Sequence, residues 1–190
     1  MRIFFTWLKS LFLFLMVVAA AGYFIYTSEW FQKNCLYPFP YQEIVYRHAL
    51  KNEVDPFLAV AVIRTESKFL PEARSDKGAV GLMQMMPETA RWVAGQIKYN
   101  GFYDNLLNDP EVNICFGTWY LASLNGEFNN NEVLVLAAYN GGRGNVKEWM
   151  RKYGWTDEFH EIEAIPFKET RDYVRKVLEA KKRYQSLYGR

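Results

Sequence analysis

The sequence predicts an all-α domain over residues 42–190, preceded by one N-terminal transmembrane helix or signal anchor. Apolar positions recur with a helical period in several segments, and no segment shows the sustained period-two alternation of a strand. Asp-Pro pairs at 55–56 and 109–110 are typical of a helix N-cap and its first residue. Because half of the residues are apolar and 17% are aromatic, a sizeable core is expected and disorder is not.

The N-terminal apolar segment divides the chain into three parts. Residues 11–26 carry no charge, and Arg2 and Lys9 precede them. These sixteen residues, as a helix, cover about 24 Å, slightly less than the hydrocarbon core of a bilayer, which is about 30 Å thick. Positive charge before the segment places the N-terminus in the cytoplasm and the domain outside. We therefore expect an anchor or signal over 1–26, a linker over 27–41 and the domain over 42–190.

A cleavable signal is the alternative to a retained anchor. Ala19, Ala20 and Ala21 supply small residues at a suitable spacing for cleavage, although the apolar run continues beyond them to Tyr26. A retained segment predicts a single-pass protein of the cell membrane with its domain outside the cytoplasm. A cleaved segment predicts a secreted protein.

Seven helices are expected within the domain. The second of them is apolar on every side over 57–63, so we expect it to be central and buried. The stretch 154–166 shows no regular period. The expected helices cover 42–52, 56–67, 87–98, 110–127, 133–139, 146–152 and 168–187.

Charge and composition argue against several classes of function. The net charge of +2 gives no reason to expect a nucleic-acid partner. Cys35 and Cys115 do not form a disulfide framework, and we expect Cys115 to be a buried thiol. His48 and His160 have no paired ligands, so no metal or organic cofactor is expected, and both are predicted at the surface or in linkers.

Glu66 is the candidate catalytic residue. A carboxylate at the end of a buried helix is unfavourable unless it is paired, protonated or in a cleft. Burial and the negative end of the helix dipole both raise its pKa, which suits a general acid near neutral pH. The equal alternative is a surface ion pair with Arg64 or Lys68.

Two further blocks contain polar residues at suggestive spacing. Gly78 and Gly81 permit tight turns and close approach of a ligand, and Gln84 offers a donor and an acceptor for a sugar's hydroxyl and acetamido groups. Tyr139 and Asn140 stand at the end of a helix before two glycines. Taken singly, the first block is only a connection between helices and Tyr139 only a core residue.

Together, these blocks resemble the lytic transglycosylases of the soluble murein-transglycosylase (SLT) type, a lysozyme-like family. The likeness lies in four blocks, in the family's order and spacing, within residues 42–187: 66–75, 78–90, 137–142 and 163–174. It implies that Glu66 is the single catalytic acid and base, and that Glu163 is a second acidic residue of the cleft. The substrate-binding residues that it implies are Ser75, Met83, Gln84, Tyr139, Asn140, Glu163 and Tyr173.

The resemblance implies cleavage of the β-1,4 bond between N-acetylmuramic acid and N-acetylglucosamine in peptidoglycan, for cell-wall remodelling. Glu66 would protonate the linking oxygen and then take a proton from the C6 hydroxyl, which closes a 1,6-anhydro ring without consuming water. The implied partners are glycan strands, the membrane through the anchor, and unidentified envelope assembly proteins.

Two other functions remain open at this point. A hydrolytic lysozyme would use Asp76 or Glu163 as the base for water. A catalytically inactive protein that binds glycan within an envelope assembly would have no need of an acid at position 66.

Overall fold

The structure, a computed structural model, describes residues 2–189, without the side chains of residues 2, 3, 5, 6 and 8–10. The chain forms two compact units. The first contains residues up to 39 together with those from 187 onward, and the second contains residues 40–186.

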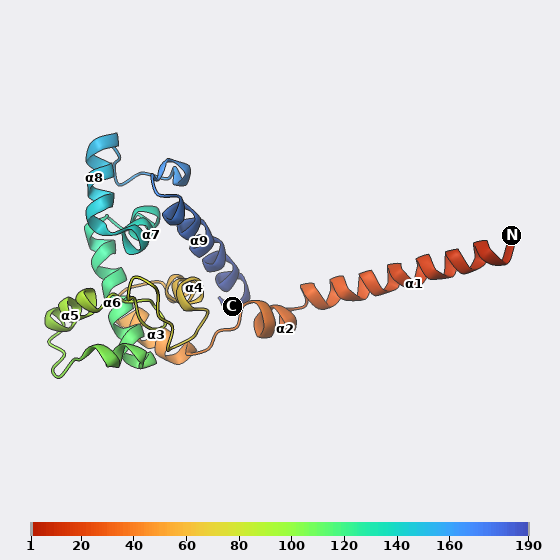
Figure 1. Cartoon of the computed structure of the whole chain (residues 1–190), viewed down its shortest axis with the longest axis horizontal. Helices are drawn as coiled ribbons and strands as arrows, with labels where there is room; N and C mark the ends of the chain where they lie inside the picture. Colours follow the sequence, from red (N-terminus) through yellow and green to blue (C-terminus); the bar gives the residue numbers. More distant parts are fainter. Residues whose placement is uncertain (1, 190) are drawn as a thin grey trace. The chain divides into compact units, whose positions relative to one another are not determined.

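The first unit is built on one long helix, α1 (Arg2–Thr27), followed by the short α2 (Glu29–Phe31) and the π-helix η1 (Gln32–Leu36) (Figure 1). Every side chain from Leu11 to Val18 is at least 52% exposed, which leaves a continuous apolar surface. Within residues 2–189, no single helix is long and apolar enough to cross a membrane. The segments Leu11–Thr27 and Glu29–Leu36, bent by 57° at their break, reach that limit only as a pair.

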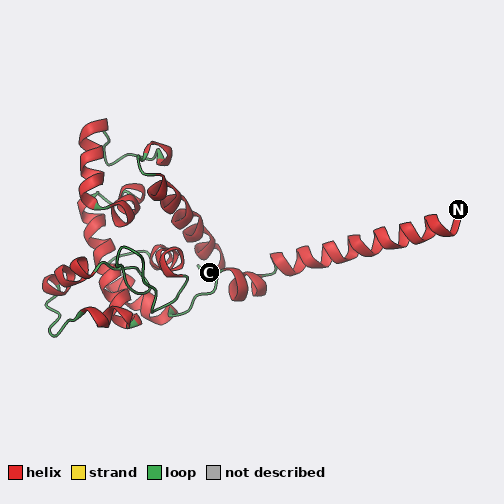
Figure 2. Ribbon diagram, viewed as in Figure 1, coloured by secondary structure: helices red, strands yellow, loops and turns green. Residues whose placement is uncertain are grey.

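The second unit is helical, and its described residues include no named strand (Figure 2). The helices predicted from the sequence are confirmed to within about three residues at each end. Two 3₁₀ helices, η2 (Asp104–Asn108) and η3 (Ile162–Ala164), were not predicted. The α-helices of this unit are α3 (Gln42–Lys51), α4 (Pro56–Ser67), α5 (Pro87–Gln96), α6 (Pro110–Glu127), α7 (Glu132–Gly141), α8 (Arg143–Tyr153) and α9 (Lys168–Tyr188), which ends in the first unit.

Side-chain caps explain where three helices begin. Asp55 Oδ1 accepts a hydrogen bond from the Phe57 N–H at 2.8 Å, and Asp109 Oδ1 accepts one from the Glu111 N–H at 2.7 Å. Both bonds confirm the predicted caps. Asn131 caps α7 in the same way, through the N–H of Leu134 at 3.0 Å.

Helix α4 is the centre of the core, as predicted. Its residues from Leu58 to Ile63 are at most 2% exposed. Each large apolar side chain buried in this way contributes roughly 1.5–3 kcal/mol to folding. The buried part of α4 therefore holds the last turn of the helix, which contains Glu66, in a fixed position.

Two expectations from the sequence need correction. His48 is not a surface residue but is only 8% exposed, because its Nε2 lies 2.6 Å from Glu111 Oε1 and joins α3 to α6. Cys115 is half-buried rather than fully enclosed, and burial raises the pKa of its thiol. It packs at the edge of a cluster formed around Phe116.

Candidate active site

Glu66 lies where α4 ends abruptly. Lys68 adopts a left-handed conformation with φ 51° and donates its N–H to the Arg64 carbonyl at 3.2 Å, which closes the last turn. Phe69 is also left-handed, with φ 66°, so the chain turns away directly after the acid. The Ser67 hydroxyl donates to the Ile63 carbonyl at 3.1 Å and holds this turn from the buried side.

The surroundings of Glu66 favour its protonated form. The pKa of its carboxyl is raised from 4.5 to about 7, mainly by burial and to a lesser extent by the negative charge of Glu169, while the nearby Tyr173 hydroxyl lowers it. Among the described residues, no ion pair joins Glu66 to Arg64, Lys68 or another cation. The predicted rise in pKa is confirmed, and the alternative of a surface ion pair is not.

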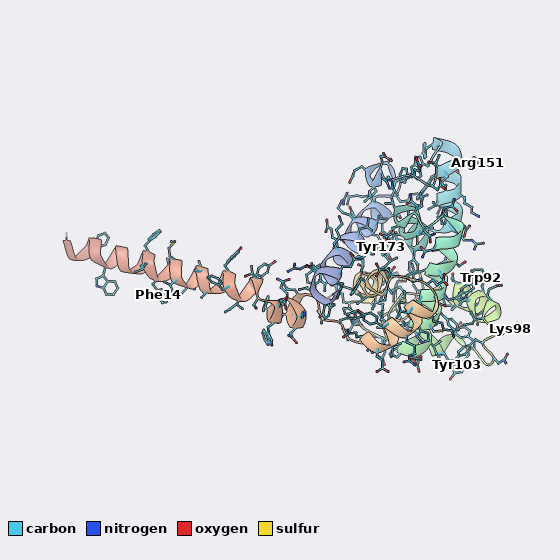
Figure 3. All side chains as sticks on the ribbon, turned by 180° about the vertical axis from the view of Figure 1, so that it is seen from behind. Phe14, Trp92, Lys98, Tyr103, Arg151 and Tyr173 are labelled. Atoms are coloured by element: carbon cyan, nitrogen blue, oxygen red, sulfur yellow. The ribbon has the colours of Figure 1, made fainter. Side chains whose placement is uncertain are left out.

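Two tyrosines face the acid, and they differ in their hydrogen bonds. The Tyr139 hydroxyl donates to the Met83 carbonyl at 2.7 Å. The Tyr173 hydroxyl, on α9 (Figure 3), is buried beside Glu66 and has no hydrogen-bond partner of standard geometry within residues 2–189. Burial and the charge of Glu66 hold the pKa of both phenols well above the usual range, so both remain neutral.

Gln84 stands on a turn that fixes the orientation of its amide. Its Nε2 donates to the Gly81 carbonyl at 2.9 Å and to the Ala73 carbonyl at 3.1 Å. Since both partners are acceptors, the amide nitrogen faces them and Oε1 points the other way. The turn requires Gly81, whose φ is 83°, because a Cβ there would lie 2.2 Å from Asn113 Nδ2.

Asn113, which sequence reasoning missed, holds this turn against α6. The side chain is fully buried. Its Oδ1 accepts from the Met83 N–H at 2.7 Å, and its Nδ2 donates to the carbonyls of Val80 at 2.9 Å and Leu107 at 2.8 Å. A lone amide within the apolar run of α6 was the signal available in the sequence, since a buried amide needs partners.

Met83 supports the site rather than lining it. Its side chain is fully buried and lies against Gly117 of α6, where an added Cβ would come within 2.3 Å of Met83 Sδ. A side chain without exposed surface offers nothing for a sugar to contact. The backbone of Met83 still matters, because its carbonyl holds the Tyr139 hydroxyl.

Ser75 and Asn140 each accept a hydrogen bond from another residue of the protein. Ser75 is exposed, and its hydroxyl accepts from the Ala79 N–H at 3.0 Å within the loop before the turn. Asn140 Oδ1 accepts from the Thr170 hydroxyl at 2.9 Å and joins α7 to α9. Thr170 also approaches Gly141, where a Cβ would lie 3.0 Å from its hydroxyl oxygen.

Glu169, which sequence reasoning did not single out, is an acid whose charge acts on Glu66. The side chain of Glu163 is 77% exposed and forms an ion pair with Arg175 of α9. Glu169, in the first turn of α9, raises the pKa of Glu66 and lies 3.6 Å from Lys77 Nζ. Its place in the fourth block that resembles the SLT family was the signal for it in the sequence.

The known proteins that this chain resembles include lytic murein transglycosylases. The chain is 37% identical over 155 residues to the soluble lytic murein transglycosylase of Escherichia coli K12, which covers 80% of this chain and 24% of that protein. It is 31% identical over 165 residues to the membrane-bound lytic murein transglycosylase C of Actinobacillus pleuropneumoniae, which covers 76% of this chain and 45% of the relative.

The solved structures that the fold resembles also include a lytic transglycosylase. The structure matches the crystal structure of the 70 kDa soluble lytic transglycosylase SLT70 from Escherichia coli with a TM-score of 0.75 and 37% identity, over 80% of this chain and 25% of that one. This chain therefore spans less than half the length of the relatives compared. The transglycosylase SLT domain model matches residues 43–162, more than half of the chain. The chain belongs to the transglycosylase SLT domain family.

Proposed function

We propose that this protein is a peptidoglycan lytic transglycosylase, an enzyme that breaks the β-1,4 bond between N-acetylmuramic acid and N-acetylglucosamine and leaves a 1,6-anhydro end. The observation that carries the proposal is the state of Glu66. With a pKa of about 7 and no ion pair recorded among the described residues, about half of the carboxyl is protonated at neutral pH. The names of the relatives supply the substrate.

The mechanism uses the one carboxyl twice. Neutral Glu66 donates its proton to the linking oxygen as the bond from that oxygen to C1 of N-acetylmuramic acid breaks. The acetamido oxygen of the same sugar stabilises the positive charge that develops at C1. Ionised Glu66 then accepts the proton of the C6 hydroxyl, whose oxygen bonds to C1 and closes the ring. The acid is regenerated, and no water is consumed.

The side chains around Glu66 fit these steps. The Tyr173 hydroxyl has no hydrogen-bond partner of standard geometry in the described residues. It is therefore available to donate a hydrogen bond to Glu66 when the carboxylate forms. Gln84 presents Oε1 as an acceptor for the acetamido N–H, since its Nε2 is held by two carbonyls. Tyr139, held by the Met83 carbonyl, has a positioning role, and Asn140 and Met83 support the walls.

Analysis of the products tests the proposal against hydrolysis. We expect the purified protein to release muropeptides with 1,6-anhydro ends from peptidoglycan, which mass spectrometry detects as products lighter by one water than hydrolytic ones. Reducible ends without anhydro sugars would instead show a lysozyme. Binding to peptidoglycan without any released product would show an inactive assembly protein.

We also propose that residues 1–26 anchor the protein in the membrane, with a linker over 27–41 and the catalytic domain over 42–190 outside the cytoplasm. The exposed apolar surface of α1 and a relative described as membrane-bound support this proposal. The double substitution Val17→Arg and Val18→Arg should release the protein from membranes washed with alkaline carbonate, while the wild type should stay bound. The mass of the N-terminal peptide then distinguishes a retained anchor from a cleaved signal.

A further inference from the structure

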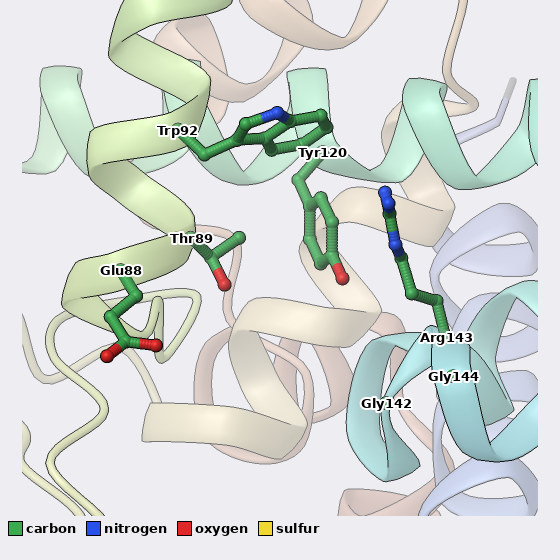
Figure 4. Close-up of a pocket in the computed structure, with 7 residues that line it drawn as sticks. All are labelled: Glu88, Thr89, Trp92, Tyr120, Gly142, Arg143 and Gly144. Atoms are coloured by element: carbon green, nitrogen blue, oxygen red, sulfur yellow. The ribbon is translucent and has the colours of Figure 1, made fainter.

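A pocket of about 440 Å³ lies between α5, α6 and the start of α8 (Figure 4). It is lined by residues of all three elements, among them Trp92, Tyr120 and Arg143. It adjoins the candidate active site through one layer of side chains, because the rings of Tyr120 and Tyr139 pack with their centroids 5.5 Å apart. Tyr139 in turn lies close enough to Glu66 for the charge of that carboxyl to raise the pKa of the phenol.

The pocket combines an aromatic wall with a cation. Arg143 carries its guanidinium 5.5 Å from the ring centroid of Trp92. The Trp92 ring is fixed by edge contacts to Trp119 at 5.3 Å and to Tyr120 at 6.2 Å. In Figure 4, the guanidinium lies beside the rings of Trp92 and Tyr120, the Thr89 hydroxyl points toward the middle of the pocket, and Glu88 lies on the opposite side.

The guanidinium of Arg143 has N–H groups that form no hydrogen bond within residues 2–189. Within residues 2–189, its one ion pair, from a terminal nitrogen to Glu127, is 3.7 Å long and thus exceeds hydrogen-bond length. Glu127 has a closer partner in Lys147. Gly142 and Gly144, on either side of Arg143, are exposed and also line the pocket. A planar guanidinium with free donors on an aromatic wall favours a carboxylate, which it can bind through two parallel hydrogen bonds.

We infer that this pocket binds a carboxylate of the peptide stem of peptidoglycan. The inference rests on the proposed function, because the stem is attached to N-acetylmuramic acid, the sugar whose bond Glu66 would break. A stem that leaves this sugar can reach a pocket one side chain beyond Tyr139. The charge of Glu88 suits an amino group on the same stem. In a stem-bearing strand the lactyl carboxyl is in amide linkage to the stem, so the carboxylates lie on the stem and not on the sugars.

The test compares one glycan with and without its stems. Soluble uncross-linked peptidoglycan strands are divided in two, and an N-acetylmuramoyl-L-alanine amidase removes the stems from one half. The lactyl carboxylates that this cleavage exposes are then converted to methylamides, so that the stripped strands carry no carboxylate. The measured quantity is the ratio of kcat/KM on stem-bearing strands to kcat/KM on stripped strands, for the full chain. Arg143→Gln should lower this ratio about tenfold or more, mainly through KM, because a charge-assisted hydrogen bond contributes roughly 1.5–3 kcal/mol. Arg143→Lys should give an intermediate ratio, since lysine keeps the positive charge but cannot form the two parallel hydrogen bonds of a guanidinium.

A matched control is the exposed Arg151 of the same helix (Figure 3). Arg151→Gln should leave the ratio at the wild-type value. Arg143→Gln should still fold, since Glu127 keeps Lys147 as its partner, and circular dichroism checks this. An unchanged ratio in Arg143→Gln, or an equal fall in Arg151→Gln, would overturn the inference.

Failure of the proposed function would look different. In that case, the wild type would make no anhydro ends on either substrate. The same ratio is then taken from the dissociation constants of the two strand preparations, measured by cosedimentation with labelled protein. A preference for stem-bearing strands that Arg143→Gln abolishes supports the pocket, and the absence of any preference in the wild type refutes it.

Discussion

Glu66 and Glu127 are two glutamates in the same kind of place with different surroundings. Each lies in the last turn of a core helix, α4 or α6, where the helix dipole disfavours a negative charge. Glu127 has a side chain that is only 16% exposed, and it is paired with Lys147 and Arg143. Glu66 has two phenols and the carboxylate of Glu169 around it, and no ion pair with it is recorded within residues 2–189.

This difference shows what keeps the carboxyl of a glutamate protonated near neutral pH. Two cations stabilise the charge of Glu127, so that residue ties α6 to α8. Near Glu66 the charge is opposed by burial and by a like charge, so the proton is retained at a pH where most carboxyls have lost theirs. The type of residue and its place in the helix are the same. Chain segments far away in the sequence, residues 143–147 and 169–173, decide the outcome.

The largest expected effect comes from removing the acid. Glu66→Gln should lower kcat for anhydro-muropeptide release by at least about 10³-fold, because the amide cannot donate a proton to the leaving oxygen. Mass spectrometry of the released products measures this loss. The control is Glu148→Gln, the same change at an exposed site on α8, and it should retain the wild-type rate. Comparable rates for wild type and Glu66→Gln would remove Glu66 from the mechanism.

The pH profile of the wild type gives the next largest effect. The pKa of Glu66 is about 7, so its protonated fraction should fall about tenfold per pH unit well above that value, and kcat/KM should fall with it. Between pH 7 and 9 the expected decrease is about fiftyfold, because half of the carboxyl is already ionised at pH 7. Initial rates on soluble glycan strands across this range provide the measurement. A rate that stays flat to pH 9 would be incompatible with one protonated carboxyl as the donor.

Removing the Glu66 carboxyl should raise stability, although it lowers activity. Its pKa is higher in the folded state, at about 7, than the ordinary 4.5, so the folded protein binds the extra proton between these values and loses stability as pH rises through them. Glu66→Gln removes this dependence. We expect the variant to exceed the wild type by about 1–3 kcal/mol in free energy of unfolding at pH 8 and by little at pH 4.5. Urea denaturation at the two pH values tests this, and an equal difference at both would contradict it.

Removing the ion-paired carboxyl of Glu127 should lower stability, and by less than Glu66→Gln raises it. Glu127→Gln leaves Lys147 and Arg143 without their partner, and their side chains are 58% and 50% exposed, so water can solvate them. The expected loss is about 1 kcal/mol in free energy of unfolding. Urea midpoints at pH 7 are the readout. A gain in stability would mean that Glu127 resembles Glu66 more closely than its ion pairs indicate.

The smallest effect concerns the like charge near the acid. Glu169→Gln removes a negative charge that raises the pKa of Glu66, so the decline in rate should begin at lower pH by a few tenths of a unit. Glu179→Gln, an exposed change later on α9, is the control and should not shift the profile. A shift to higher pH in Glu169→Gln would show that Glu169 does not act through its charge.

The helices and the acid could be predicted because their signals are local. Asp55, Pro56 and the apolar run after them define both the start of α4 and its burial, and Glu66 follows in the same helix. Spacing alone could not show that Met83 lies against Gly117, because that contact joins two distant segments. Spacing alone also could not show which acid of the fourth block acts on Glu66. Glu163 and Glu169 are both acids near α9, and only the folded chain shows that Glu169 acts on Glu66.

The contact between Met83 and Gly117 restricts how these two positions can evolve. A methyl group at position 117 would come within 2.3 Å of the sulfur of Met83, on a helix whose backbone is fixed in the core. Alanine at 117 can therefore be accepted only after position 83 has become smaller. The opposite order passes through a destabilised intermediate. Across the family, the two positions should vary together, and a large residue at one should coincide with glycine at the other.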